Sequence, residues 1–170
     1  MAHRHERGIP SNVNIGGHPV HPMVIEFPIA FLVGAFVTDL VYLFTADPFW
    51  LNASFWLVVG GFAMGLVAAV IGAVDFFTIG RVRERVEGWI HAGGNALVLL
   101  LTAVNLGLRL GNPLLGDQLV VGVVLSGLVT ALLAVTGWYG GELVYRHLVA
   151  VVGAREPSPR EEEAERRRIA

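Results

Sequence analysis

The residues of this chain with the widest chemical use are its histidines. Six histidines and no cysteine occur among 170 residues. Without cysteine the chain cannot form disulfides, zinc ribbons, iron–sulfur ligation, thioether-attached haem or a cysteine nucleophile. Ligand chemistry therefore falls to imidazole nitrogens, supported by carboxylates and amides.

Six polar side chains are predicted to gather at one depth of a helix bundle, although they come from separate segments. Two precede the first predicted span, one ends the second, two share a face of the third, and one follows the fourth. Polar and ionisable groups inside a membrane are costly, so their clustering favours a functional site. The set is His18, His21, Asp75, His91, Asn95 and His147.

The first interpretation of this set is a b-type haem, which two histidines on facing helices can hold without cysteine. His91, inside the third span, is the first-choice ligand, and His147 is its first-choice partner, with His18 or His21 as the alternatives. His18 and His21 are expected to serve as a further ligand site or a lid, with Asn95 in the cofactor site. The protein would then be a redox or electron-transfer accessory subunit.

The second interpretation is a metal ion. His18-Pro-Val-His21-Pro-Met23 offers two imidazoles three residues apart and a thioether, which suit copper or, without the methionine, zinc. Iron is a further alternative for the wider set. The candidate metal ligands are His18, His21, His91, His147 and Asp75, in a metal-binding or metal/proton-translocating protein.

A third interpretation is structural: the polar cluster tethers loops in a subunit of a larger complex. No nucleophile–base–orienter set is evident, so independent catalytic activity is not expected. A nucleic-acid partner is not expected either, because the basic run Arg166–Arg168 is balanced by acidic residues at 161–165.

The elements that must position these residues are membrane-spanning helices. The chain is 54% hydrophobic and only 15% charged, far from a soluble domain. Four apolar stretches, at about 24–45, 53–79, 88–110 and 119–141, are long enough to cross a bilayer. The sequence thus predicts an all-α, four-helix transmembrane bundle over 18–152. Residues 1–17 are expected to be a flexible polar arm, 142–152 an interfacial helix, and 153–170 a disordered charged tail.

Charge placement predicts the orientation of the bundle. Four spans put both termini on one side, together with the loop that carries Arg81, Arg83 and Arg85. The positive-inside rule then assigns that side to the cytoplasm. Asp39 and Arg109 lie toward the other side and are predicted to form an ion pair. The two hairpins share length but no evident motif, which argues against an inverted-repeat transporter.

Several motifs resemble a family of bacterial four-helix membrane proteins catalogued as a domain of unknown function. They are Gly17-His18-Pro-Val-His21-Pro-Met23, Phe27-Pro28-Ile29, Asp39-Leu40, Gly72…Asp75-Phe76, His91 with Asn95, and Gly137-Trp138…Gly140-Gly141-Glu142-Leu143-Val144-Tyr145-Arg146-His147. The resemblance covers about residues 16–152. It implies a bacterial inner-membrane protein associated with redox modules such as Rieske-type or cytochrome c domains. In the electron-transfer interpretation the protein would exchange electrons with quinone, and the glycine-containing helix faces predict an oligomer or a larger complex.

Overall fold

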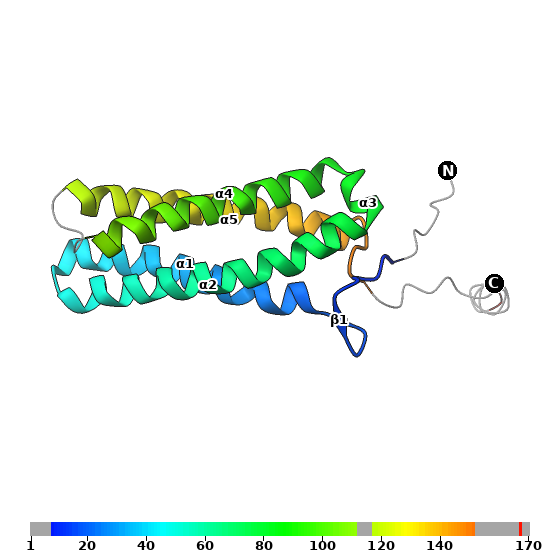
Figure 1. Cartoon of the computed structure of the whole chain (residues 1–170), viewed down its shortest axis with the longest axis horizontal. Helices are drawn as coiled ribbons and strands as arrows, with labels where there is room; N and C mark the ends of the chain where they lie inside the picture. The colour runs from blue at the N-terminus through cyan, green and yellow to red at the C-terminus, as the bar shows by residue number, and fades with distance from the viewer. Residues whose placement is uncertain (1–7, 112–116, 152–166, 168–170) are drawn as a thin grey trace.

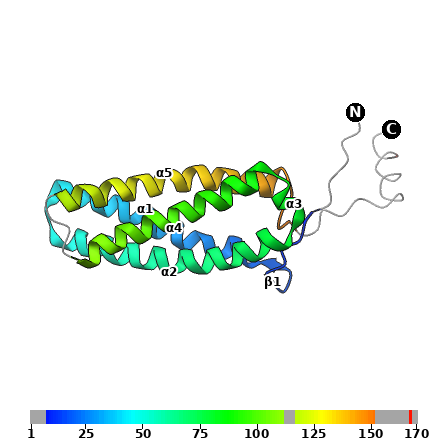
Figure 2. The ribbon, with the colours of Figure 1, turned by 45° about the horizontal axis from the view of Figure 1, so that its top comes forward.

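The protein is an antiparallel bundle of four long helices in a computed structural model that describes residues 8–111, 117–151 and 167. The long helices are α1 (Val20–Thr45), α2 (Pro48–Thr78), α4 (Val86–Gly111) and α5 (Asp117–Tyr145), and α3 (Gly80–Arg83) is a short turn between α2 and α4. Figures 1 and 2 show residues 8–19 and the end of α5 at the same end of the bundle as α3. We refer to this end as the α3 end.

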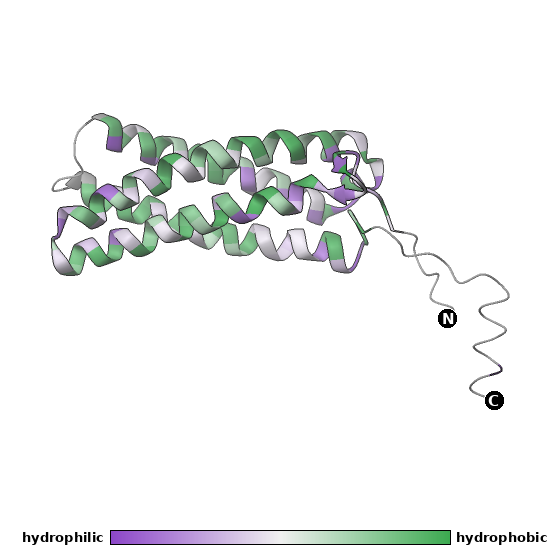
Figure 3. Cartoon of the chain, turned by 90° about the horizontal axis from the view of Figure 1, so that it is seen from below, coloured by the Kyte–Doolittle hydropathy of each residue, from purple (hydrophilic) through white to green (hydrophobic). Residues whose placement is uncertain are grey.

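The four helices are long and apolar enough to cross a membrane. Each has at least 26 residues and is therefore about 39 Å or longer, against a hydrocarbon core of about 30 Å. Large apolar side chains such as Phe44, Phe77 and Trp138 are exposed on the outside, and hydrophobic residues dominate the length of the bundle in Figure 3. These observations confirm the predicted all-α, four-span membrane domain.

The helices form a square in which α1 lies opposite α4. The closest packing occurs within the hairpins α1–α2 and α4–α5, and α2–α4 and α1–α5 are the other neighbouring pairs. Residues on α1 and α4 that point to the bundle axis therefore face each other across the core. This arrangement decides which polar side chains can meet.

Local chemistry explains why two helices begin earlier than the sequence pattern predicted. Proline is tolerated in the first turn of a helix because the amide hydrogens there have no intrahelical acceptor. Pro22 lies in the first turn of α1, so His21 is inside the helix rather than before it. In α2 the Asp47 side chain accepts from Phe49 N at 2.9 Å and Pro48 is the first residue, leaving Ala46 and Asp47 as the connection.

The α3 end of the bundle is covered by two ordered segments. Residues 8–19 contain the short pair β1 (Asn14–Ile15) and β2 (His18–Pro19), and Ile9 exchanges backbone hydrogen bonds with Leu148 and Ala150. Residues 8–17 are thus not the flexible arm that was expected. The expected interfacial helix over 142–152 is instead the last turn of α5 followed by non-helical residues. Residues 1–7 and most of the tail lie outside the described part.

Candidate functional site

Two histidines face each other across the core near the α3 end. His21 on α1 and His91 on α4 have ring centroids 6.2 Å apart, with ring planes at 83°. Each ring is held by the neighbouring helix of its own hairpin: His21 Nδ1 lies 3.1 Å from Ala68 O, and His91 Nδ1 lies 2.8 Å from Thr136 O.

These hydrogen bonds fix the tautomer of both rings. A backbone carbonyl oxygen only accepts, so each Nδ1 must carry the proton. In the neutral form Nε2 then holds a lone pair, and no hydrogen-bond partner to Nε2 of His21 or His91 occurs among the described residues. An imidazole held at one nitrogen by a backbone carbonyl, with the other nitrogen available, is the usual form of a ligand histidine.

Glycines on the other two helices make room for the rings. A Cβ at Gly72 of α2 would lie 2.8 Å from His21 Cε1, and one at Gly140 of α5 would lie 2.9 Å from His91 Cε1. Both distances are too short for any other residue without displacement of the ring. We call His21, Gly72, His91 and Gly140 the histidine layer.

Asn95 supports one side of the histidine layer. Its Nδ2 donates to His91 O at 2.8 Å, and its Oδ1 accepts from Thr136 Oγ1 at 3.4 Å. The amide therefore links α4 to the same residue of α5 whose carbonyl holds the His91 ring.

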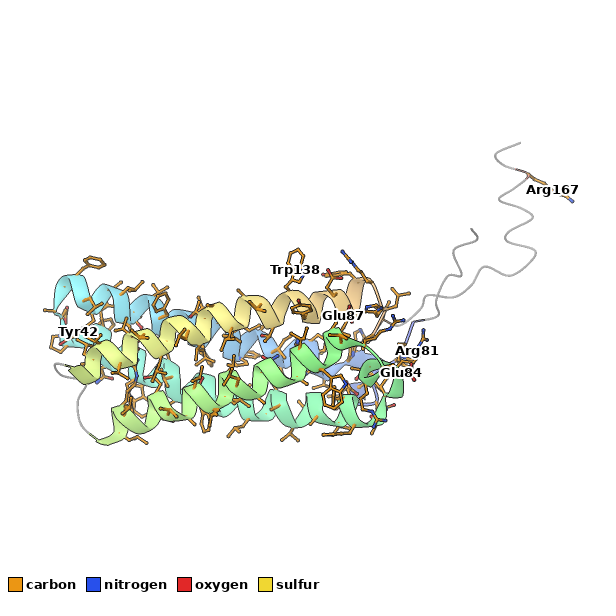
Figure 4. All side chains as sticks on the ribbon, turned by 90° about the horizontal axis from the view of Figure 1, so that it is seen from above. Tyr42, Arg81, Glu84, Glu87, Trp138 and Arg167 are labelled. Carbon is orange, nitrogen blue, oxygen red and sulfur yellow. The ribbon has the colours of Figure 1, made fainter. Side chains whose placement is uncertain are left out.

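The other predicted site residues lie elsewhere. His18 is exposed in β2, and Met23 is 59% exposed, so they do not join the half-buried His21. His147 follows α5, with its Nε2 3.8 Å from Glu87 Oε1; Figure 4 places Glu87 at the α3 end with Arg81 and Glu84.

Asp75 holds the segment that covers the α3 end. Its carboxylate accepts from Ser11 Oγ at 2.6 Å, Asn12 N at 2.8 Å and Val13 N at 3.3 Å. No group of three or more His, Cys, Asp or Glu residues suited to a metal ion exists in the described part of the chain.

A second buried polar cluster lies at the opposite end of the core, the end marked by Tyr42 in Figure 4. Arg109 Nη2 on α4 is 2.7 Å from Asp39 Oδ2 on α1, and both side chains are almost fully buried. This confirms the ion pair predicted from the sequence. We call Asp39, Ser54, Asn105, Arg109 and Ser126 the charge cluster.

The charge cluster joins all four long helices. Arg109 also donates to Ser54 Oγ at 2.7 Å and to Asn105 Oδ1 at 2.9 Å. Ser126 Oγ donates to Asp39 Oδ2 at 2.8 Å and accepts from Asn105 Nδ2 at 2.9 Å. No buried side-chain polar atom among the described residues lacks a partner, so the cluster stabilises the bundle without offering a site.

Sequence reasoning missed the residues that hold the two clusters. Ala68 and Thr136 act through backbone carbonyls, which carry no sequence signal. Gly72 and Gly140 each lie four residues beyond one of these, on the same helix face. Ser54, Asn105 and Ser126 could have been found as small polar residues in apolar spans, where they need partners.

Comparison with known proteins gives the family. No curated protein and no solved structure is detectably similar to the chain. A family model described as a predicted membrane protein matches residues 17–153, which include all four long helices, the histidine layer and the charge cluster. The chain belongs to this family, DUF2231.

Proposed function

We propose that the histidine layer binds a b-type haem, which His21 and His91 would hold, and that the protein is a small electron-transfer subunit. The observation that supports this most is the pair of facing rings, each fixed through Nδ1. The ring centroids lie 6.2 Å apart, so the two imidazoles are near enough to hold one bound group between them.

The number of ligands favours a haem over a bare metal ion. A structural zinc site needs four protein ligands and a catalytic one three, whereas a haem brings four ring nitrogens and needs one or two side chains. The histidine layer supplies two imidazoles, and the described residues contain no larger ligand group. The two helices without a histidine carry glycine at this level, so each imidazole lies directly against the neighbouring helix.

The chain's own residues would set the properties of such a site. Ala68 O and Thr136 O orient the rings and raise the basicity of Nε2. Held by two imidazoles, such a group would supply electron transfer rather than substrate binding. The site lies near the α3 end, where a redox partner of the Rieske or cytochrome type, or quinone, would dock. Arg81, Arg83 and Arg85 support a cytoplasmic assignment of that end.

A reduced-minus-oxidised visible spectrum of the detergent-purified protein, from cells supplied with a haem precursor, tests this proposal. We expect sharp α and Soret bands that disappear in His21→Ala and His91→Ala. The matched controls His18→Ala and His147→Ala remove imidazoles at the same end of the bundle and should keep the bands. A wild-type spectrum without these bands, or equal loss in His147→Ala, would contradict the proposal.

A further inference from the structure

The inner faces of the two hairpins correspond position by position. Adding 70 to a residue number on α1 gives its counterpart on α4, and the burial classes agree at all six inner positions. The inner residues follow a spacing of four and three, which keeps one face toward the core. The pairs are His21/His91, Ile25/Asn95, Pro28/Val98, Leu32/Thr102, Ala35/Asn105 and Asp39/Arg109.

The second helices of the hairpins correspond in the same way, with an offset of 68. Five of the six inner positions have the same burial class. The pairs are Ser54/Gly122, Val58/Ser126, Gly61/Val129, Gly65/Leu133, Ala68/Thr136 and Gly72/Gly140. Only two of these twelve pairs are identical, which is why the repeat is not evident from the sequence.

The contacts repeat as well as the positions. His21 bonds to the carbonyl of Ala68, and its counterpart His91 bonds to the carbonyl of the counterpart residue, Thr136. Both rings also lie with Cε1 and then Nδ1 nearest to the equivalent glycine, at 2.8 and 3.1 Å from a Cβ at Gly72 and 2.9 and 3.0 Å from one at Gly140. Two matching hydrogen bonds and two matching close contacts are not expected from unrelated hairpins.

We infer that the bundle is a duplicated helical hairpin, and that Asp39 and Arg109 are the residues that make the two unlike halves pair. α1 and α4 both run away from the α3 end (Figures 1 and 2), so the halves are related by a two-fold axis along the bundle. This is a parallel repeat, distinct from the inverted repeats of many transporters. The inference does not depend on the proposed haem.

The opposite charges of Asp39 and Arg109 determine which hairpins can pack against each other. Asp39 and Arg109 are counterparts across the axis and touch each other at 2.7 Å. Two first hairpins paired through this face would bury two carboxylates against each other, and two second hairpins would bury two guanidinium groups. Like charges buried together are strongly unfavourable. The inner face of each hairpin therefore accepts the opposite half and rejects its own copy.

Exchange of the two charges in the full chain tests the inference. Asp39→Arg and Arg109→Asp each bury a like-charged pair, and each should lower the melting temperature in detergent by about 10 °C or abolish the folded monomer. The double variant D39R/R109D should recover most of this loss. Around a two-fold axis the backbone positions of residues 39 and 109 are equivalent, and Ser54 and Ser126 contact both charges.

A matched control tests whether stability requires the charges at the equivalent positions 39 and 109, or only one positive and one negative charge in the core. The variant N105R/R109N moves the guanidinium one turn along α4 and keeps the composition of the chain, and it should stay as unstable as the single variants. A D39R/R109D chain that is no more stable than Asp39→Arg would overturn the inference, because the two positions would then not be interchangeable. If N105R/R109N were as stable as D39R/R109D, the inference would be overturned as well.

Discussion

At one end of the bundle core two imidazoles face each other, and at the other end a guanidinium faces a carboxylate. Both pairs lie between α1 and α4 and use supporting groups on α2 and α5. The charge cluster satisfies its polar atoms internally. The histidine layer uses Nδ1 of each ring and leaves Nε2 with a lone pair. A closed network stabilises a bundle, whereas available lone pairs provide a ligand site.

The largest effect on stability is expected from breaking the charge cluster. Asp39→Ala leaves the Arg109 guanidinium buried without its carboxylate, and loss of one partner of a buried ion pair costs about 3–5 kcal/mol. Thermal unfolding followed by size-exclusion chromatography in detergent measures this. Replacement of both residues, D39L/R109M, should be much milder because no charge remains buried. An Asp39→Ala protein as stable as wild type would show that the cluster contributes little.

A smaller effect is expected from filling the histidine layer. Gly72→Ala and Gly140→Ala place a Cβ 2.8 and 2.9 Å from an imidazole carbon; the ring must shift, at about 1–3 kcal/mol for overpacking. Haem content should fall in both variants. The control is Gly93→Ala, where a Cβ meets nothing within 4 Å. This change should preserve both the stability and the haem content. If all three alanine variants had the same stability and haem content, the close packing of the rings against Gly72 and Gly140 would not matter.

A local effect is expected at the cover of the α3 end. Asp75→Asn replaces a carboxylate oxygen that accepts a hydrogen bond with an NH₂ group, so contacts to Ser11 or to the amides of residues 12 and 13 are lost. The loss of a hydrogen bond to a charged acceptor costs about 1–3 kcal/mol. Amide hydrogen exchange should accelerate over residues 9–15 while exchange in the middle of α1 and α4 stays unchanged. Acceleration throughout the bundle would contradict this local role.

The smallest effect on stability should accompany the largest effect on binding. In His21→Asn and His91→Asn the amide NH₂ can replace Nδ1–H as donor to Ala68 O or Thr136 O, but no nitrogen replaces Nε2. The free energy of unfolding of the haem-free protein should change by about 0.5 kcal/mol or less, since the hydrogen bond is kept. Haem absorption should be lost. If the asparagine variants retained it, the ligands would have to lie elsewhere.

The sequence predicted the four spans and the Asp39–Arg109 pair because both follow from the cost of polar groups in hydrocarbon. It left open which histidine faces His91 across the core. His147 and His21 are both histidines near the same end of the bundle, and spacing along the chain does not say which helix lies opposite which. α1 and α4 face each other because of how the two whole hairpins pack. In addition, α1 begins at Val20, earlier than predicted, and this places His21 inside the bundle.

The central claim is that the histidine layer binds haem, and the most direct measurement is the haem content of the purified wild-type chain as its pyridine haemochrome. With His21 and His91 as the proposed ligands, we expect about one b-type haem per chain. A preparation from haem-supplied cells that is folded and monodisperse, yet contains no haem, would contradict the claim. The two histidines would then serve only to tie α1 to α2 and α4 to α5.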